Sequence, residues 1–410
     1  MSTHPSTRVF RFVALAGLCA AVLFGSVSSA SAQRCPGPAG FNKWLQGFKQ
    51  EAIAEGISPS TVANALNGVT YDSRVVAKDR AQGVFAQDFL TFQRRMANNN
   101  RLAAGKARLK KYASVFKQVE QQYGVPGPVL VAFWGLETDY GAFMGKMDSI
   151  RALATLSYDC RRPEKFRPQL MDALRVLDRG DLRRSQMIGP THGEVGQFQF
   201  QPSTYYKFAV DYDGDGRRDL VKSVPDSLAS AANYLAEKGW QPGQPWLEEV
   251  IVPKDLPWDQ ADVTMQRPRL FWSKYGVKYR NGQPLPADAT PTALLLPMGR
   301  NGPAFLAYPN FINIYLDWNH SLVYSTTAGY FATRLAGAPP LRTGNPVPFS
   351  AADSKQLQRL LQRRGYDVGK VDGVIGAATR SAIRETQLQY GLPADGYPSQ
   401  ALLRKLQAGG

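Results

Sequence analysis

A single glutamate at the end of an apolar run has the setting in this sequence that best suits acid–base chemistry. Glu137 lies within "VAFWGLETDYGAF", residues 131–143, behind apolar residues that begin at Val129. Burial and the negative end of a helix dipole both disfavour a charged carboxyl group, so we expect a raised pKa for Glu137. A carboxyl group of that kind can act as a general acid near neutral pH. A buried glutamate paired with an arginine is the alternative that this pattern leaves open.

The segment that must position Glu137 is predicted to be a buried helix. Pro126 and Pro128 suit a helix start, the residues after them are apolar nearly all round, and Gly141 ends the pattern. Helical spacing of apolar residues also predicts helices over 41–56, 106–124 and 227–239, whereas strand-like alternation is sparse. The chain is therefore predicted to be mainly α.

Two segments indicate how the chain is divided. Residues 1–32 read as a secretory signal peptide, because Arg8 and Arg11 precede an apolar stretch that ends at an A-x-A cleavage site at residues 30–32. Residues 337–349 are rich in proline and glycine and have no helical or strand period, which predicts a linker. We therefore expect one domain over 33–336 and a second over 350–410, in an exported protein whose mature chain has no membrane span.

Charge and cysteine content narrow the class of protein. The net charge is +16, and loss of the signal peptide leaves +14, which favours polyanionic partners such as cell-wall polymers or anionic lipid; in an exported protein we do not expect nucleic acid. Export also predicts a disulfide between Cys35 and Cys160, the two cysteines that remain, with two free thiols as the alternative. No cluster of histidine and cysteine has zinc spacing, which argues against a zinc peptidase.

The C-terminal 60 or so residues split into three helical pieces around "DGVIGAAT", residues 372–379. This D-G-x-x-G-x-x-T pattern, followed by Ala382-Ile383 and Gly391-Leu392, closely resembles the small three-helix peptidoglycan-binding domain of cell-wall enzymes. Thr386 departs from that family, which usually has an aromatic residue there. A three-helix bundle of another role is the alternative.

The longer N-terminal part resembles the membrane-bound lytic transglycosylase B family over roughly residues 39–336. The matching segments are "GLETDYG", "ALATLSYDCRRPEKF", "GEVGQFQFQPSTYYKFAVDYDGDG", "AANYLAEKGW" and "PNFINIYLDWNHSLVY". The resemblance implies a lysozyme-like helical domain that cleaves the β-1,4 bond between N-acetylmuramic acid and N-acetylglucosamine and leaves a 1,6-anhydromuramyl end. It makes Glu137 the single general acid and base, and it requires no cofactor for the chemistry.

The same resemblance implies the residues of the sugar cleft. Gln199 and Tyr234 would line it, with Trp318 and Tyr324 opposite; core packing is the alternative role for the aromatic residues. The family often has a serine near the catalytic acid, nine residues before the glutamine. Here that position is Pro190, so hydroxyl support of Glu137 would be absent or would fall to Thr191.

Most glycosidases use two carboxyl groups, so we considered which residue could supply a second one beside Glu137. Asp139 lies two residues from Glu137 and would point elsewhere on a helix. Glu194 belongs to the glycine-rich segment, residues 189–201, and could face the cleft. If either residue positions a water molecule, the enzyme would be a muramidase that hydrolyses the same bond.

The acidic loop "DYDGDGRRD", residues 211–219, reads as the opening of a calcium loop. Asp211, Asp213 and Asp215 alternate before a glycine, and Arg217 could add its carbonyl oxygen. The twelfth position is a lysine, so we expect Asp226 to close a structural site for Ca²⁺ or Na⁺. An Asx-rich turn without an ion is the alternative.

These features together predict an exported, periplasmic lytic transglycosylase that is associated with the cell wall. Its partners would be peptidoglycan glycan strands, with other cell-wall enzymes as further candidates. The alternatives are the muramidase, and a catalytically inactive wall-binding scaffold, against which the intact Glu137 motif argues.

Overall fold

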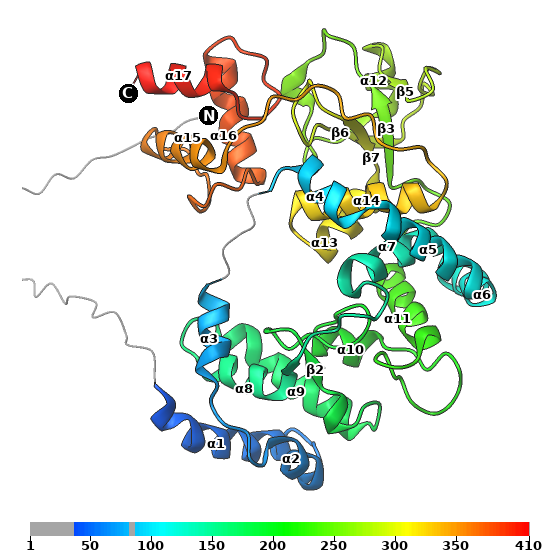
Figure 1. The fold of residues 1–410 in the computed structure, drawn as a ribbon, viewed down its shortest axis with the longest axis vertical. Helices are drawn as coiled ribbons and strands as arrows, with labels where there is room; N and C mark the ends of the chain where they lie inside the picture. Colours follow the sequence, from blue (N-terminus) through cyan, green and yellow to red (C-terminus); the bar gives the residue numbers. More distant parts are fainter. Residues whose placement is uncertain (1–36, 82–86, 410) are drawn as a thin grey trace, which may run out of the picture. The chain divides into compact units, whose positions relative to one another are not determined.

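The computed structural model describes residues 37–81 and 87–409, which are mainly helical, as predicted (Figure 1). The helices that precede the main sheet are α1 (Phe41–Ala54), α2 (Pro59–Leu66), α3 (Ser73–Arg80), α4 (Phe89–Met96), α5 (Asn99–Lys111), α6 (Ala113–Tyr123), α7 (Gly127–Thr138), α8 (Ser149–Tyr158), α9 (Pro163–Asp178), α10 (Pro202–Phe208) and α11 (Val224–Glu237). The predicted signal peptide lies outside the described residues, and so does Cys35. The Cys35–Cys160 pairing therefore remains a prediction.

Helix α7 is the buried centre of the helical part. Val129, Leu130 and Phe133 have no exposed surface, and other helices pack around α7, including α5, α11 and α14 (Leu322–Leu335). This explains why the sequence of α7 has no polar face: a helix that is covered on all sides must be apolar all round. Glu137 is the one ionisable residue of α7.

A two-stranded ribbon ties the segment after α7 to the glycine-rich segment. Strands β1 (Met147–Asp148) and β2 (Ile188–Gly189) pair in antiparallel fashion, with Met147 opposite Gly189. Closer to the helix end, the Thr138 hydroxyl donates a hydrogen bond to the Gln197 carbonyl oxygen at 2.7 Å. These contacts hold the glycine-rich segment beside the C-terminal end of α7.

A five-stranded antiparallel sheet, which the sequence reading did not identify, follows α11. Its strands, in spatial order, are β4 (Arg267–Pro268), β6 (Pro291–Leu295), β7 (Ala304–Ala307), β3 (Leu247–Ile251) and β5 (Lys278–Tyr279). All of β7 and all but the first residue of β6 are buried, so their sequences read as short apolar runs instead of alternating. Such runs cannot be distinguished from buried helix by period. The sheet packs against α12 (Arg269–Lys274) around the fully buried Trp272.

Two residues that contact Glu137 come from the elements after the sheet. A π-helical segment, η4 (Asn310–Tyr315), continues into the single turn α13 (Leu316–Trp318), and α14 then packs along α7. Ser321 caps α14 by accepting a hydrogen bond from the Tyr324 N–H. Trp318 and Tyr324 are therefore fixed by the end of one element and the start of the next.

The three C-terminal helices are α15 (Ala351–Arg363), α16 (Ala377–Gln389) and α17 (Gln400–Ala408), and they enclose a separate core that includes Leu357, Ile383 and Leu402. The residues of the D-G-x-x-G-x-x-T pattern build this fold. The Gly373 N–H donates to Gln358 Oε1 at 2.8 Å, and the Thr379 hydroxyl donates to the Val368 carbonyl oxygen at 2.9 Å. The pattern therefore has a structural role in shaping the turn before α16.

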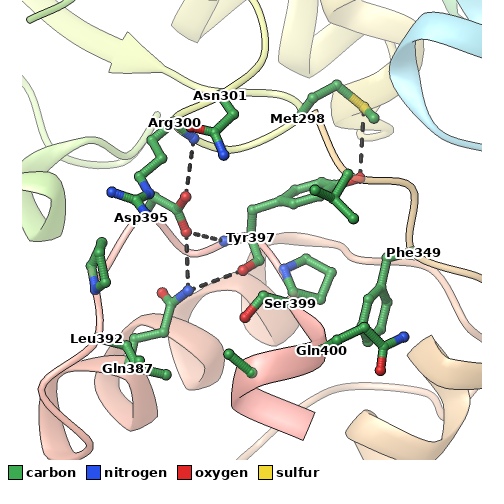
Figure 2. Close-up of a pocket in the computed structure, with 14 residues that line it drawn as sticks. Met298, Arg300, Asn301, Phe349, Gln387, Leu392, Asp395, Tyr397, Ser399 and Gln400 are labelled. Carbon is green, nitrogen blue, oxygen red and sulfur yellow. Dashed lines mark hydrogen bonds between the residues drawn. The ribbon is translucent and has the colours of Figure 1, made fainter. Parts of the chain in front are cut away.

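Helix α16 also contacts the loops of the sheet region. The buried Arg380 donates to the carbonyl oxygens of Leu296 and Pro297 at 3.1 and 2.8 Å, and the buried Arg384 forms an ion pair with Asp262. Figure 2 shows the adjoining pocket, where Asp395 accepts a hydrogen bond from the Arg300 N–H at 3.0 Å. The C-terminal helices are therefore docked on the sheet region through specific polar contacts.

None of the helices in the described ranges is long and apolar enough to cross a membrane.

Candidate active site

Two side chains from distant parts of the sequence hold one oxygen of Glu137. The Trp318 indole N–H donates to Glu137 Oε1 at 2.8 Å, and the Tyr324 hydroxyl donates to the same atom at 2.5 Å. No hydrogen bond to Oε2 occurs among the described residues, so Oε2 is the oxygen that remains available to carry a proton. No arginine pairs with Glu137 within the described ranges, which removes the structural alternative considered above.

The setting of Glu137 favours its neutral form. Burial raises the pKa of the Glu137 carboxyl group, and the nearby charge of Glu194 raises it further, while the hydrogen bonds from Tyr324 and Trp318 oppose the shift. Burial also raises the pKa of Tyr324 well above its usual value, so its hydroxyl remains a donor. A carboxyl group that is protonated near neutral pH can act as a general acid.

The backbone directly after Glu137 is strained. Helix α7 ends at Thr138, and the next three residues, Asp139, Tyr140 and Gly141, all have positive φ angles of 51°, 64° and 85°. Left-handed conformations are uncommon for residues other than glycine and cluster at functional sites. In the described part of the chain, Gln199 is the one other non-glycine residue with a positive φ, and it belongs to the same site.

Glu137 lies in a pocket of about 480 Å³ that is lined mainly by the glycine-rich segment and by α13. Gln199, Tyr234 and Trp318 are among the lining residues; Tyr324 is not, and it contacts Glu137 instead. The Trp318 ring stacks on Phe133 with centroids 4.2 Å apart and meets the Tyr234 ring edge-on at 5.7 Å. The structure thus places all four predicted cleft residues at or next to the pocket, where aromatic faces suit sugar rings.

The structure distinguishes the two residues that could supply a second catalytic carboxyl group. Asp139 forms an ion pair with Arg101, with 3.0 Å between Oδ1 and Nε, and it does not line the pocket. Glu194 does line the pocket. The hydroxyl beside Glu137 comes from Tyr324, whereas the Thr191 hydroxyl lies 3.5 Å from the Met147 sulfur.

One polar cluster next to the pocket was not identified from the sequence. His192 Nε2 lies 2.9 Å from Asp79 Oδ1, and the buried Asp79 also forms ion pairs with Arg161 and Arg162. On its other side, His192 Nδ1 lies 3.9 Å from Glu194 Oε1. Asp79 and His192 are 113 residues apart in the chain, so local sequence patterns carry no sign of this contact.

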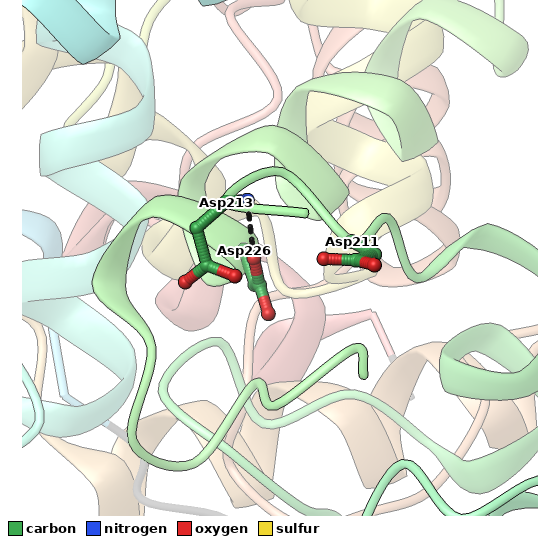
Figure 3. Close-up of side chains that lie close together, drawn as sticks. All are labelled: Asp211, Asp213 and Asp226. Atoms are coloured by element: carbon green, nitrogen blue, oxygen red, sulfur yellow. Dashed lines mark hydrogen bonds between the residues drawn. The ribbon is translucent and has the colours of Figure 1, made fainter. Parts of the chain in front are cut away.

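The acidic loop brings three of its predicted ligands together. One carboxylate oxygen from each of Asp211, Asp213 and Asp226 lies within 4.8 Å of the others (Figure 3). Three carboxylates form an oxygen-rich set that could hold an ion and fits a hard cation such as Ca²⁺. Asp215 is exposed and accepts a hydrogen bond from the Arg217 N–H at 2.8 Å, outside this trio.

The same loop also has the features of a turn. Asp211 accepts hydrogen bonds from the N–H groups of Gly214 and Gly216, each at 2.9 Å. Asp226 accepts one from the Tyr212 N–H, also at 2.9 Å. Burial, opposed by these hydrogen bonds, raises the pKa of Asp226, and the Asp213 carboxylate raises it further. A bound cation would relieve this repulsion.

Comparison with known proteins assigns both parts of the chain to families. Residues 40–333 match the family model described as a transglycosylase SLT domain, and residues 350–406 match that of a peptidoglycan binding domain. Over 244 residues, the chain is 30% identical to the membrane-bound lytic murein transglycosylase B of Escherichia coli strain K12. This match covers 58% of the chain and 64% of that relative, so the chain spans less than two thirds of its length.

Two solved structures extend the likeness to the fold. SltB3 from Pseudomonas aeruginosa, crystallised with NAG-anhNAM-pentapeptide, is 42% identical with a TM-score of 0.83, and the match covers 90% of this chain and 99% of that chain. The Escherichia coli lytic transglycosylase Slt35, crystallised with calcium, is 26% identical with a TM-score of 0.61, and the match covers 71% of this chain and 92% of that chain.

Proposed function

The chain belongs to the family of transglycosylase SLT domains, and from this premise we propose that it is a lytic transglycosylase of peptidoglycan. It cleaves the β-1,4 bond between N-acetylmuramic acid and N-acetylglucosamine and forms 1,6-anhydromuramyl ends. The observation that carries the proposal is the environment of Glu137: a carboxyl group with a raised pKa, held through one oxygen by two donors, within a pocket lined by aromatic and amide side chains.

In the proposed reaction, Glu137 acts first as an acid and then as a base. Its proton passes to the glycosidic oxygen as the bond to the muramyl anomeric carbon breaks, and the substrate's own N-acetyl group stabilises the positive charge. The carboxylate then takes the proton of the muramyl 6-hydroxyl as that oxygen attacks the anomeric carbon. Because the nucleophile belongs to the substrate, no second carboxylate is required, in contrast to most glycosidases.

We assign the remaining site residues to binding and stability. Gln199, Tyr234 and Trp318 contact the glycan, and Tyr324 orients Glu137 from behind. The C-terminal helices hold the enzyme on the polymer, which is consistent with their family match. We place the protein in the periplasm on the cell wall, because residues 1–32 read as a secretory signal peptide and the C-terminal helices match a peptidoglycan binding domain. Asp211, Asp213 and Asp226 hold a structural Ca²⁺ or Na⁺ that takes no part in the chemistry.

The second candidate function is hydrolysis of the same bond, which the position of Glu194 in the pocket favours. A carboxylate on the far side of the sugar could activate a water molecule, as in inverting glycosidases. The two reactions give different ends: a 1,6-anhydromuramyl end from the transglycosylase and a reducing end from the hydrolase.

Mass spectrometry of muropeptides released from purified peptidoglycan tests this proposal. We expect anhydro products from the mature protein and none from Glu137→Gln, which keeps the size of the side chain but cannot act as an acid. Glu120→Gln, at an exposed position of α6, is the matched control and should behave as the parent. Reducing ends would establish the hydrolase instead, and binding without any product would establish the scaffold.

A further inference from the structure

Two enclosed oxygen atoms in the pocket have no hydrogen-bond donor. Glu194 Oε2 and Gln201 Oε1 are both buried from solvent, and neither has a partner among the described residues. Both residues line the pocket that contains Glu137. A buried acceptor without a donor is destabilising, because it has lost its hydrogen bonds to water without replacement. Two such atoms on residues that line one pocket point to a ligand that supplies N–H or O–H groups to them.

The two residues form a fixed pair. Val195 and Phe200 face each other in an antiparallel bridge, so Glu194 and Gln201, which flank it, emerge next to each other. The Gln201 amide donates from Nε2 to Glu194 Oε1 at 3.0 Å. This bond leaves one acceptor oxygen on each side chain, Oε2 of Glu194 and Oε1 of Gln201, for a ligand.

The charges around this pair favour a cationic ligand group. Among the carboxyl groups that line the pocket, Asp317 is paired with Lys238 at 2.9 Å, whereas Glu194 has no lysine or arginine partner in the described ranges. His192 is the basic group that approaches Glu194, at 3.9 Å, and it is already bound to Asp79. Lys165 also lines the pocket, from an exposed position of α9, and it forms no ion pair with a described residue.

We propose that Glu194 and Gln201 form a binding subsite for an N–H donor of the glycan, and that Glu194 allows the cleft to take a glucosamine residue whose amine is free and charged. This inference rests on the proposed function. An acetamido group offers a single N–H, which one acceptor oxygen satisfies. An ammonium group offers three N–H donors and a positive charge, and charge-assisted hydrogen bonds are about twice as strong as neutral ones.

Steady-state kinetics on two glycan substrates test the subsite. The substrates are fully N-acetylated peptidoglycan strands and the same strands after partial de-N-acetylation of their glucosamine residues. We expect the parent to cleave the de-N-acetylated strands at least as well as the acetylated ones. For Glu194→Gln, kcat/KM should fall about tenfold on de-N-acetylated strands and about threefold or less on acetylated strands, mainly through KM.

Two further variants distinguish this binding role from a general loss of folding or activity. Glu164→Gln removes the same charge at an exposed position of α9 outside the pocket and should leave both substrates unaffected. Gln201→Met keeps the volume but removes both the acceptor and the donor to Glu194 Oε1. It should raise KM about threefold on both substrates, and because the charge of Glu194 remains, the preference between them should not change.

The outcomes distinguish this inference from the proposed function. A Glu194→Gln variant that folds and keeps the parent's ratio between the two substrates overturns the subsite. If instead Glu194→Gln changes the released ends, Glu194 acts on the reaction and the binding role is wrong. Should Glu194→Gln fail to fold, an unchanged KM for Gln201→Met overturns the subsite. A parent that cleaves neither substrate contradicts the proposed function itself.

Discussion

The hydrogen bonds to Glu137 act against its burial, and this balance determines how the residue can work. Burial alone would hold the proton so firmly that the carboxylate form needed for the second step would be too unstable. The donors Trp318 and Tyr324 stabilise that form through Oε1 without occupying Oε2. One residue can thereby serve as acid and then as base, since its two states are brought closer in free energy.

Removing one donor tests this balance. In Tyr324→Phe the hydrogen bond that lowers the pKa of Glu137 is lost, so that pKa should rise further. Because the free enzyme needs a protonated Glu137, the limb of the pH–kcat/KM profile that falls toward high pH should move to higher pH. At neutral pH, kcat should fall about tenfold, because the carboxylate has lost a hydrogen bond to a charged group.

Tyr330→Phe is the matched control for this change. Tyr330 lies on the same helix, and its hydroxyl accepts a hydrogen bond from the Leu341 N–H at 3.1 Å. In the described ranges it makes no hydrogen bond to Glu137. Its pH profile should match that of the parent. An alkaline limb that stays in place, or moves to lower pH, in Tyr324→Phe would show that Tyr324 does not stabilise the carboxylate.

Among the elements, the ribbon of β1 and β2 is closely approached by the backbone of Gly145, which lies just before β1. A Cβ atom on Gly145 would lie 2.2 Å from the Gly189 carbonyl carbon, at a φ of +100°. Gly180 has a similar φ of +82°, but a Cβ atom there would meet nothing within 4 Å. Alanine substitutions at these two glycines distinguish the free-energy cost of the strained backbone conformation from that of a steric clash.

We expect Gly145→Ala to lower the free energy of unfolding by about 3 kcal/mol or more and to reduce activity, because the ribbon must open. Gly180→Ala should cost about 1–2 kcal/mol, the strain of the backbone alone, with activity retained. Urea unfolding and muropeptide release measure the two effects. Equal losses in both variants would mean that the ribbon is not closely packed against the glycine-rich segment.

The acidic loop is the second element with a direct test. If Asp211, Asp213 and Asp226 hold calcium, the ion should raise the Tm of the mature protein, with about 2.7 kcal/mol of stabilisation at a concentration one hundred times Kd. Asp213→Asn should abolish this shift, while Asp215→Asn, outside the trio, should keep most of it. A Tm that is independent of calcium, sodium and chelator would leave the loop as an Asx-rich turn.

At the scale of the whole molecule, the contacts of α16 with the sheet region dock the C-terminal helices. Arg384 and Asp262 are both buried, with exposed side-chain fractions of 6% and 10%. Removing one partner of a buried ion pair leaves an uncompensated charge and costs about 3–5 kcal/mol. The linker is also attached to the sheet, because the Arg342 N–H donates to Oε1 of Glu249 in β3 at 2.9 Å.

Asp262→Ala should therefore release the C-terminal helices from the sheet region. Amide hydrogen exchange should speed up at the docking loops around residues 296–301, and proteolysis should become faster within residues 337–349. Asp255→Ala, an exposed position nearby in the sequence, is the control and should show neither change. Unchanged exchange and proteolysis in Asp262→Ala would show that this ion pair does not hold the tail.

Whether a contact could be predicted from the sequence depended on how far apart its residues lie in the chain. The local pattern around Glu137 predicted its helix, and the family resemblance predicted Trp318 and Tyr324 as cleft residues, although not as hydrogen-bond donors to Glu137. By contrast, the pair of Asp79 with His192 and the docking of Arg384 on Asp262 join residues more than 100 positions apart. No local period encodes such contacts. The sheet was missed for a different reason, since buried strands such as β7 do not alternate.

The most direct test of the central claim is the origin of the oxygen at the new muramyl end. Cleavage in H₂¹⁸O should give products that contain no ¹⁸O when analysed by mass spectrometry, because the muramyl 6-hydroxyl displaces the leaving group and no water is added. Incorporation of one ¹⁸O atom at the anomeric carbon in the primary product would contradict the account, since it would show that Glu137 serves a hydrolase.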